Sequence, residues 1–472
     1  MARRLVISAS PGEQRAAIVD AEGRVQRFFL ERAQRPSRVG NIYVGRVRSA
    51  VAGLAGLFVD VGDAEIFVSA ADVPPPAILS GARAAKPNQR NAMPIAEGAL
   101  IVVQIAADAV GDKRARGTGI IGLPLRALTF RPWTGGVAVA RGAAPARAEA
   151  LRKALTPTLK KGEGVVVRAH AVSAPLEHLR REIDAARITW QTLSAAATRS
   201  MAPGLIHADL PFAPRLAREV GGELDIDVDD ADLERQVRTA LPDARVTVHP
   251  DSLFETLGLE DEWQGLLERR VALPKGASLT VDMAEAATLI DVDATGGAGE
   301  GTVAHRLAVN LDAAAAIARQ LRLRDIGGQV LVDFLRLERD ADRQRVLKAL
   351  IASANDDERP VKILGFTRLG LVELTRKREG PSIVELLARP GQPTSLAKSF
   401  ETIGHELLRG VLAADRAQPG RVRAVAVSAD LGGALDGAAL AIARSIVERR
   451  LGRALELRIT AGRVSEAWLV VL

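Results

Sequence analysis

Three aspartates near the ends of two apolar segments are the residues best suited to chemistry. The segment ATLIDVDAT contains Asp291 and Asp293, and the segment QVLVDF contains Asp333. Side chains alternate along a strand, so Asp291 and Asp293 would share one face. An unpaired charge is costly among apolar residues, which favours a strand end beside a cation. Each aspartate taken alone is better explained as a turn or capping residue, whereas the three together favour a metal site.

The expected metal is Mg²⁺. If two adjacent strands end side by side, Asp291 and Asp333 meet, and Mg²⁺ needs only one or two protein carboxylates besides water and phosphate oxygens. The flanking segments are basic, through Arg269, Arg270, Lys275, Arg322, Arg324, Lys362, Arg368, Arg376, Lys377 and Arg378. A single basic run is usually a solvated face, but carboxylates ringed by cations fit a polyanion held near a divalent ion. The two aspartate segments contain no histidine, which argues against a histidine pair that activates the 2′-hydroxyl of RNA.

A glycine-punctuated region at residues 37–73 predicts a small β-barrel. Its apolar residues alternate with a period of two over short strands, as in closed barrels. Residues 74–94 predict a long surface loop, and residues 98–106 predict the strand that closes the barrel. Phe58 and Phe67 either stack RNA bases or fill the barrel core, and the pattern slightly favours the core. If RNA binds there, Arg46, Arg48 and Lys113 could contact its phosphates.

The remaining segments predict alternating strands and helices. Residues 274–378 predict a β-β-α-β-α-β-β unit, in which Asn310 caps the first helix and Gly327-Gly328 ends it. Residues 393–472 predict a small αβαββ module. Further towards the N-terminus, a strand running into a helix is capped by Asp229 or Asp230.

Composition excludes several classes of protein. A length of 472 residues corresponds to about three domains. The formal charge of +7 permits an anionic partner without requiring one. The absence of cysteine excludes disulfides, thiolate nucleophiles and Cys-ligated zinc. No apolar run reaches the roughly 18 residues of a membrane span, and the N-terminal residues lack the apolar stretch of a signal peptide. We therefore expect a cytoplasmic protein without a membrane span.

The chain resembles the ribonuclease E/G family. The resemblance rests on LIDVDATGG, NLDAAAAIARQLRLRDIGGQVLVDFLRL and GFTRLGLVELTRKR, and on GNIYVGRV, GLFVDVG and IFVSAADV near the N-terminus. These segments occur in order and extend over nearly the whole chain, and the LRLRDIGG…VDF segment is highly specific.

The resemblance implies an α/β, multi-domain fold. Its expected parts are an RNase-H-like subdomain in two pieces (1–36 and 216–273), an inserted OB-fold RNA-binding barrel (37–118), a 5′-sensor region (119–215), a deoxyribonuclease-I-like α/β catalytic subdomain (274–392) and a small αβ C-terminal domain (393–472).

The resemblance also assigns site residues. It makes Asp291 and Asp333 the catalytic, metal-binding aspartates, while the position of Asp293 is usually Asn in relatives and neighbours the metal. The RNA contacts that it implies are Phe58, Phe67 and Lys113 in the barrel and Arg168 in the 5′-sensor. The basic pattern around the aspartates adds Arg368 and Arg376 as expected RNA contacts.

The sequence departs from the family pattern in two places. Relatives carry two cysteines of a zinc link between protomers after the TRKR segment, where this chain reads EGPSIVELLARPGQP. We therefore expect no zinc, and any homo-oligomer would not be zinc-linked. In the 5′-sensor loop, relatives read Arg-Thr-Ala-Gly, whereas this chain reads Arg168-Ala169-His170-Ala171 and lacks the threonine hydroxyl.

These observations predict a Mg²⁺-dependent endoribonuclease for single-stranded RNA that acts in RNA processing or decay, including rRNA processing and mRNA decay. A metal-activated water would attack the phosphodiester and leave a 5′-phosphate and a 3′-hydroxyl. The alternative is a non-catalytic RNA-binding protein on the same scaffold. Retention of both aspartates favours the enzyme.

Overall fold

The computed structural model describes residues 3–51, 55–80, 95–111, 113–140, 143–222, 224–294, 301–355, 357–389, 397–460 and 468–471. Most of the predicted loop at 74–94 and the predicted domain boundary between residues 392 and 393 lie outside these residues. The chain forms two compact units. The first comprises Met1–Pro36, Asp225–Arg235 and Arg245–Leu472, and the second comprises Ser37–Leu224 and Gln236–Ala244. No helix in the described part of the chain is both long and apolar enough to span a membrane.

The N-terminal strands of the first unit form a mixed sheet with two strands from the middle of the chain. Its order is β15-β14-β1-β2-β3, with bounds Arg245–Val248, Leu224–Val228, Arg3–Ser10, Glu13–Val19 and Val25–Arg32. Helices α5 (Leu253–Thr256) and α6 (Leu259–Gln264) supply Phe254 and Trp263, which pack on Phe28 of β3. Helix α4 (Ala231–Ala240) follows β14. The carboxylate of Asp230 accepts hydrogen bonds from the backbone N–H groups of Asp232 and Leu233, so Asp230 caps this helix.

A closed five-stranded barrel forms one part of the second unit. Its strands are β4 (Ile42–Val51), β5 (Gly56–Asp60), β6 (Glu65–Ser69), β8 (Arg116–Thr118) and β7 (Leu100–Ala107). Antiparallel pairing of β4 with β7 closes the barrel, which confirms the closure predicted for residues 98–106. Strand β13 (Gly204–His207) pairs antiparallel with the first residues of β4.

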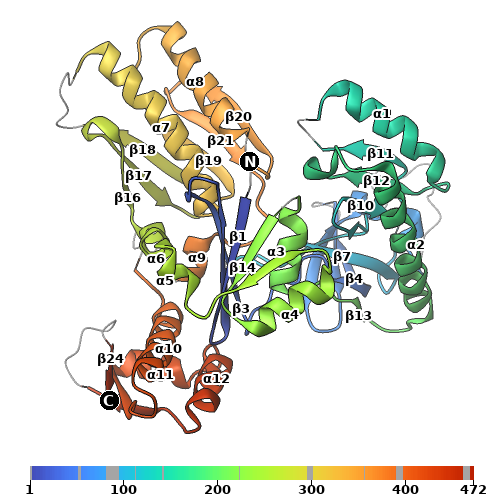
Figure 1. Ribbon diagram of the computed structural model, residues 1–472. Helices are drawn as coiled ribbons and strands as arrows, with labels where there is room; N and C mark the ends of the chain where they lie inside the picture. Colours follow the sequence, from blue (N-terminus) through green and yellow to red (C-terminus); the bar gives the residue numbers. More distant parts are fainter. Residues whose placement is uncertain are drawn as a thin grey trace. The chain divides into compact units, whose positions relative to one another are not determined.

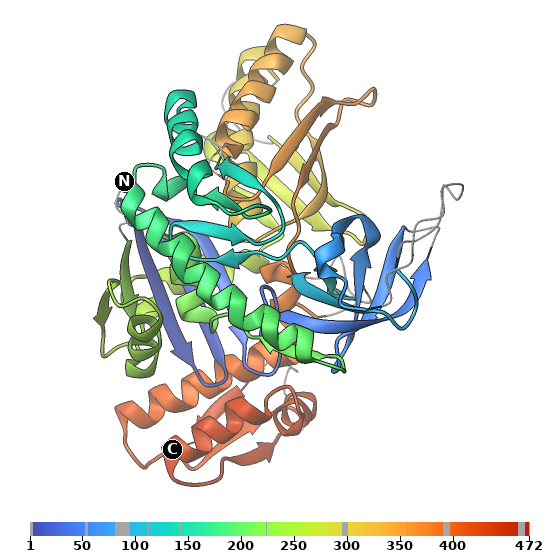
Figure 2. The ribbon, with the colours of Figure 1, turned by 90° about the vertical axis from the view of Figure 1, so that its right-hand side faces the viewer.

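A second sheet and two helices complete this unit. The sheet order is β11-β12-β10-β9, with bounds Gly136–Val139, Gly164–Val167, Leu128–Arg131 and Leu123–Pro124. Helix α1 (Pro145–Leu155) packs on β11, and the long helix α2 (Leu176–Arg199) packs along β10 and β13, as its course in Figure 2 shows (green). Helix α3 (Phe212–Val220) precedes β14.

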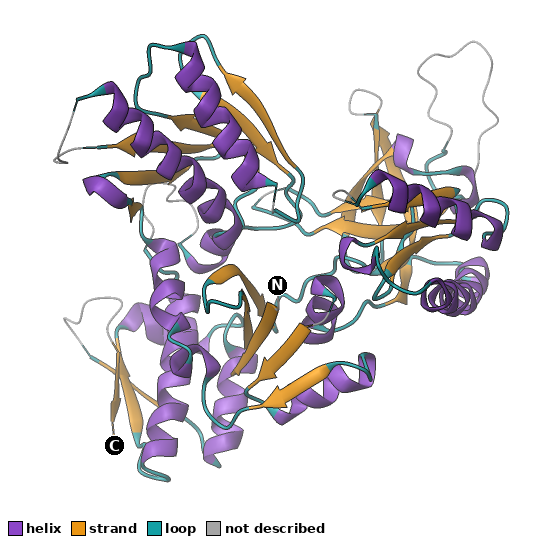
Figure 3. Cartoon of the chain, turned by 45° about the horizontal axis from the view of Figure 1, so that its top comes forward, coloured by secondary structure: helices purple, strands orange, loops and turns teal. Residues whose placement is uncertain are grey.

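The aspartate segments belong to a six-stranded sheet in the first unit. The order is β16-β17-β18-β19-β21-β20, with bounds Arg270–Ala272, Ser278–Met283, Thr288–Asp293, Gly328–Asp333, Val372–Arg376 and Val361–Phe366. Helices α7 (Val303–Leu323) and α8 (Asp340–Ala354) cover one face (Figures 1 and 3). The element order from β17 to β21 confirms the predicted β-β-α-β-α-β-β unit. Alternate strand residues, including Ile290 and Val332, pack under the helices.

The described part of the C-terminal module contains one helix more than the predicted αβαββ order. It pairs β22 (Ala424–Val427) with β23 (Glu456–Ile459) and β24 (Trp468–Val471). Helices α10 (Phe400–Ala417), α11 (Ala429–Asp436) and α12 (Ala441–Leu451) complete it, and α9 (Ile383–Leu387) precedes it. The additional helix is α11, which begins where Ser428 Oγ accepts a hydrogen bond from the N–H of Leu431.

Candidate active site

The two predicted metal ligands, Asp291 and Asp333, are direct neighbours on adjacent parallel strands. The ladder between β18 and β19 ends with the pair Asp291 and Asp333. Neighbouring strands lie about 4.8 Å apart and paired residues direct their side chains to the same face. Both side chains are exposed, whereas Ile290 and Val332 beside them are buried on the helix-covered face. The strand ends therefore meet as the apolar pattern predicts, and their role as ligands stays a prediction.

The negative charge of this pair is not neutralised by the described side chains. Burial raises the pKa of Asp291, and the nearby carboxylates of Asp333 and Asp293 raise it further. In the described ranges no ion pair reaches Asp291 or Asp333, whereas Asp293 pairs with Arg270 at 3.4 Å. A cation beside the pair would relieve this repulsion.

The donor set fits a hard divalent ion that retains water. The described residues contain no group of three or more His, Cys, Asp or Glu placed to enclose a metal. Two facing carboxylates match the small number of protein ligands that Mg²⁺ takes beside a phosphate. The pair is therefore compatible with Mg²⁺ on the chemistry of its oxygen ligands.

The predicted ring of cations around the aspartates is largely a set of internal ion pairs. The pairs are Arg269 with Asp282, Arg270 with Asp293, Lys275 with Asp312, Lys377 with Glu379 and Arg378 with Glu385. Arg322 and Arg324 donate to backbone carbonyl groups. Of the ten predicted cations, all described, only Lys362 and Arg368 are exposed and without such a partner. Arg368 lies in the turn between β20 and β21, where a phosphate can reach it.

Arg376 is a correction to the predicted RNA contacts. Its side chain is 0% exposed and pairs with Asp357 at 2.7 Å and with Asp325 at 2.9 Å. It also donates to the carbonyl of Ile326 at 3.0 Å. Burial lowers the pKa of Arg376, but the hydrogen bond to Asp357 and the charges of Asp325 and Asp357 outweigh it, and the pKa is raised. Arg376 therefore stabilises the start of β19 from the core and does not face a ligand.

The LRLRDIGG segment, like Arg376, holds the fold in place and does not face a ligand. Asp325 follows α7 with a left-handed φ of 54° and accepts ion pairs from Arg376 and Arg359 at 2.9 and 2.6 Å. Gly327 passes so close to the backbone of Arg378 that a Cβ would lie 2.9 Å from its Cα. The segment therefore fixes the turn from α7 into β19, and with it the strand that carries Asp333.

Asn310 is a second correction and a positioning residue that the sequence pattern missed. Helix α7 begins earlier than predicted, where Thr302 Oγ1 accepts a hydrogen bond from the N–H of His305. Asn310 lies inside the helix, fully buried. Its side-chain amide donates to the carbonyl of Leu335 at 2.8 Å and accepts from the N–H of Leu335 at 3.0 Å. It thus holds the backbone directly after Asp333 and Phe334. A polar residue among alanines in an apolar helix was the available signal.

Phe58 and Phe67 lie on the outer surface of the barrel. They are direct cross-strand partners on β5 and β6, with ring centroids 5.8 Å apart in an edge-to-face arrangement. Leu57, Val59 and Ile66 fill the interior instead. The slightly favoured core interpretation is therefore wrong, because the alternation places both rings outward.

Cations and a glycine complete this surface. Arg114 lies over the Phe58 ring at 5.0 Å from its centroid, and the predicted contact Lys113 is exposed next to it in sequence. Phe67 covers Gly56, where a Cβ would approach the ring to 2.2 Å. Half-exposed aromatic rings beside cations are the elements of a surface for single-stranded nucleic acid.

In the predicted 5′-sensor loop, Arg168 and His170 both contact backbone carbonyl groups of their own unit. Arg168 is half-buried, and its Nη1 donates to the carbonyl of Glu219 at 3.4 Å. Burial lowers the pKa of Arg168, and the charge of Arg218 lowers it further. His170 Nε2 contacts the carbonyl of Arg126 at 2.9 Å. Because a carbonyl only accepts, this nitrogen carries its proton towards the protein, and it is not free to replace the absent threonine hydroxyl.

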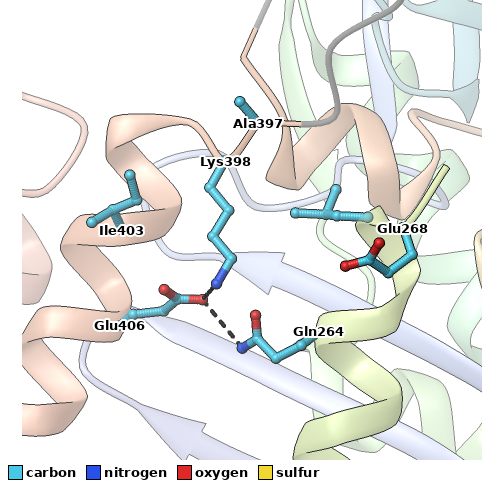
Figure 4. A pocket seen from close by; sticks show the side chains of 7 residues that line it. Gln264, Glu268, Ala397, Lys398, Ile403 and Glu406 are labelled. Atoms are coloured by element: carbon cyan, nitrogen blue, oxygen red, sulfur yellow. Dashed lines mark hydrogen bonds and ion pairs between the residues drawn. The ribbon is translucent and has the colours of Figure 1, made fainter. Parts of the chain in front are cut away.

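A polar cavity of about 420 Å³ lies elsewhere in the first unit. It is lined by Gln264, Leu267, Glu268, Ala397, Lys398, Ile403 and Glu406 (Figure 4). Glu406 accepts hydrogen bonds from Lys398 at 2.7 Å and from Gln264 at 3.3 Å. The cavity contains none of the predicted site residues, and its polar groups largely satisfy one another, so it is not the site of the expected chemistry.

Comparison with known proteins identifies the family of this chain. Residues 123–379 match the model of the ribonuclease E/G family. The chain is 30% identical to ribonuclease G of Escherichia coli K12 over 436 residues, 87% of this chain and 88% of that protein. It is 31% identical to ribonuclease G of Salmonella typhimurium SL1344 over 432 residues, with 87% and 88% covered. It is 29% identical to ribonuclease E of Nostoc sp. PCC 7120 over 407 residues, 82% of this chain and 57% of that protein. The chain belongs to the ribonuclease E/G family.

Proposed function

We propose that this protein is a Mg²⁺-dependent endoribonuclease that cleaves single-stranded RNA, with Asp291 and Asp333 as its metal ligands. The observation that carries the proposal is the register of β18 and β19, which pairs these two exposed carboxylates. Similarity to proteins named ribonuclease G and ribonuclease E supports the reaction class. The proposed setting is the cytoplasm, in RNA processing or decay that includes rRNA and mRNA.

The chain's own residues supply binding and orientation. Phe58 and Phe67 would stack bases, and Lys113 and Arg368 would hold phosphates in competition with salt. Asp291 and Asp333 would hold Mg²⁺ against the scissile phosphate. The bound ion would polarise that phosphate and lower the pKa of a water. We propose products with a 5′-phosphate and a 3′-hydroxyl.

The subdomain names belong to the proposal as well. We propose that the sheet β15-β14-β1-β2-β3 is the RNase-H-like subdomain, the barrel the OB-fold, and the β16–β21 sheet the deoxyribonuclease-I-like catalytic subdomain. Residues 119–215 would be the 5′-sensor region and residues 393–472 the small C-terminal domain. Any homo-oligomer would form without a zinc link, because the chain has no cysteine.

The test is cleavage of a 5′-labelled unstructured RNA with and without Mg²⁺. Asp291→Asn and Asp333→Asn should each abolish cleavage while RNA binding, measured by fluorescence anisotropy in EDTA, stays nearly unchanged. The control is Asp340→Asn at the start of α8, whose side chain is 90% exposed; it should cleave like the wild type. Cleavage at the wild-type rate by either site variant in saturating Mg²⁺ would refute the assignment. RNA binding without Mg²⁺-dependent cleavage in the wild type would favour the non-catalytic alternative.

A further inference from the structure

A third carboxylate lies beside the aspartate pair and has its own cation. Asp293 follows Asp291 by two residues on β18 and therefore shares its face of the sheet. Asp293 is opposite Ser278 on β17, and Arg270 is opposite Thr280 from the edge strand β16. Asp293 and Arg270 are thus placed diagonally across β17, and an ion pair of 3.4 Å joins them.

The Arg270 guanidinium is held at two points. Nη2 donates to Asp293, and Nε donates to Ser278 Oγ at 2.9 Å. Ser278 is buried, with 4% of its surface exposed, so this second contact is a fixed anchor. The Arg270 side chain itself is 64% exposed, which makes the pair a weak contributor to folding stability. Its effect is on the charge of the face that carries Asp291 and Asp333.

Charge decides what this face can bind. Without Arg270, three carboxylates would stand within two residue rows of β18 and β19, and no other described cation pairs with any of them. Excess negative charge strengthens binding of a free divalent ion but opposes approach of an RNA phosphate. Arg270 cancels the charge of Asp293 and leaves the net charge of two carboxylates at the site.

We propose that the charge of Arg270, which offsets that of Asp293, sets the affinity of the Asp291–Asp333 site for its divalent metal. The proposal rests on the proposed metal site and adds a residue outside it. Residues two apart on a strand are separated by about 7 Å, so the unit charge of Arg270 acts on the metal from roughly 8 Å. Coulomb's law in water then gives about a fivefold effect on the affinity for a divalent ion. Salt should reduce it to about twofold near 0.1 M.

The experiment titrates Mn²⁺ into the RNA-free full chain and measures free Mn²⁺ by electron paramagnetic resonance. Arg270→Gln should bind Mn²⁺ about two- to fivefold more tightly than the wild type, and Asp293→Asn about two- to fivefold more weakly. The double variant should return to within about twofold of the wild type, because both charges are gone. Lys275→Gln is the matched control, because its partner Asp312 lies on α7, over the covered face.

The opposite directions of the two changes in Mn²⁺ affinity distinguish this electrostatic role from a purely structural one. A merely structural contact predicts weaker binding in both single variants and no recovery in the double variant, and that result would overturn the proposal. An unchanged affinity in Arg270→Gln would overturn it as well. Asp291→Asn distinguishes the two levels: if it leaves Mn²⁺ binding intact, the metal site itself is wrong. If it abolishes binding while Arg270→Gln has no effect, only the role of Arg270 is wrong.

Discussion

The side-chain amide of Asn310 holds the backbone of Leu335 through two hydrogen bonds, one to its N–H at 3.0 Å and one to its carbonyl at 2.8 Å. Leu335 follows Asp333 by two residues, and Asn310 lies fully buried inside α7. The helix therefore determines the direction in which the chain leaves β19. The position of Asp333 relative to Asp291 depends on this contact as well as on strand pairing.

Asn310→Ala should impair cleavage beyond its effect on stability. It leaves two buried backbone groups of Leu335 without partners, at a cost of about 1–3 kcal/mol each. Val309→Ala is the matched control, since Val309 is also fully buried on α7 and its truncation costs a comparable amount through a cavity. Thermal melting and cleavage assays should be run at equal distances below each Tm. Equal activity of the two variants there would show that Asn310 only stabilises the fold.

Substitution of Arg368 should weaken RNA binding, whereas substitution of Arg376 should lower stability. Arg368→Gln removes an exposed phosphate contact, so affinity should fall across RNA sequences and the salt dependence should lose about one ion. Arg376→Gln breaks a buried pair with Asp357 and Asp325, which costs about 3–5 kcal/mol and lowers Tm. Salt titrations of RNA affinity and melting curves on both variants measure the contrast. A folded Arg376→Gln with selectively weakened RNA binding would contradict the buried role.

Apolar patterning predicted the parts of the fold that depend on local alternation. Strands β18 and β19 alternate between buried and exposed residues, and their ends place Asp291 beside Asp333. The closing strand β7 is instead a continuous apolar run that is almost wholly buried. Helix α11 was missed because its sequence LGGALD contains adjacent glycines, which disfavour helix. Tertiary packing and the Ser428 cap override that preference.

The sequence pattern could not predict which charged side chains pair with one another across the fold. A basic segment gives no sign of which side chains find carboxylates, so Arg376 resembled Arg368 until the fold brought Asp325 and Asp357 to it. The same holds for Asn310, whose apparent capping role depends on where the helix starts. For Phe58 and Phe67 the alternation was visible, but which face of a barrel strand points inward depends on the neighbouring residues Leu57 and Ile66.

Phe58 and Phe67 should contribute to RNA binding and little to stability. Phe58→Ala and Phe67→Ala should each weaken single-stranded RNA binding by about 1–3 kcal/mol, with little change in Tm, because both rings lie outside the core. Phe29→Ala is a matched control, since an arginine also lies over that ring at 4.4 Å in a sheet without predicted RNA contacts. RNA titrations and melting curves on the same samples provide the measurement. Unchanged affinity with a large fall in Tm would refute base stacking.

Gly56 offers an independent check of the same surface. A Cβ at this position would lie 2.2 Å from the Phe67 ring, so Gly56→Ala should displace the ring without removing it. Affinity should fall in the same direction as in Phe67→Ala. A Gly56→Ala variant that is folded and binds RNA as tightly as the wild type would show that the position of this ring does not matter.

Cleavage should be nearly indifferent to the 5′ group of the RNA. Ala169 offers no hydroxyl, and His170 Nε2 faces the carbonyl of Arg126, so we expect less than about a threefold preference for a 5′-monophosphate over a 5′-hydroxyl at pH 6 and pH 8. Ala169→Thr should raise the preference to about tenfold, the worth of one charge-assisted hydrogen bond. Rates on two otherwise identical oligonucleotides measure it. A wild-type preference above about tenfold would show that the loop senses the end without its threonine.

Acid stability should depend on Glu13, which joins the N-terminal sheet to the C-terminal module. Its carboxylate on β2 pairs with Arg32 at 3.0 Å and with Arg409 of α10 at 2.8 Å. Burial raises the pKa of Glu13, but Arg409 and then Arg32 outweigh it and lower the pKa from 4.5 to about 2. A carboxyl with a lower pKa in the folded state contributes its stability above pH 4.5. That stability is lost as the pH falls from 4.5 through about 2.

Glu13→Gln should therefore destabilise the protein at pH 7 by several kcal/mol, because it leaves the buried guanidinium group of Arg32 and the half-buried one of Arg409 without their shared carboxylate. The difference from the wild type should shrink as the pH falls from 4.5 towards about 2, since the wild-type carboxyl then becomes neutral too. Urea unfolding followed by circular dichroism at a series of pH values measures this difference. Glu149→Gln is the control, because its ion pair with Arg152 on α1 is at the surface, with a Glu149 side chain 73% exposed. A Glu13→Gln difference that stays constant from pH 7 to pH 3 would mean that the ion cluster does not couple folding to this proton.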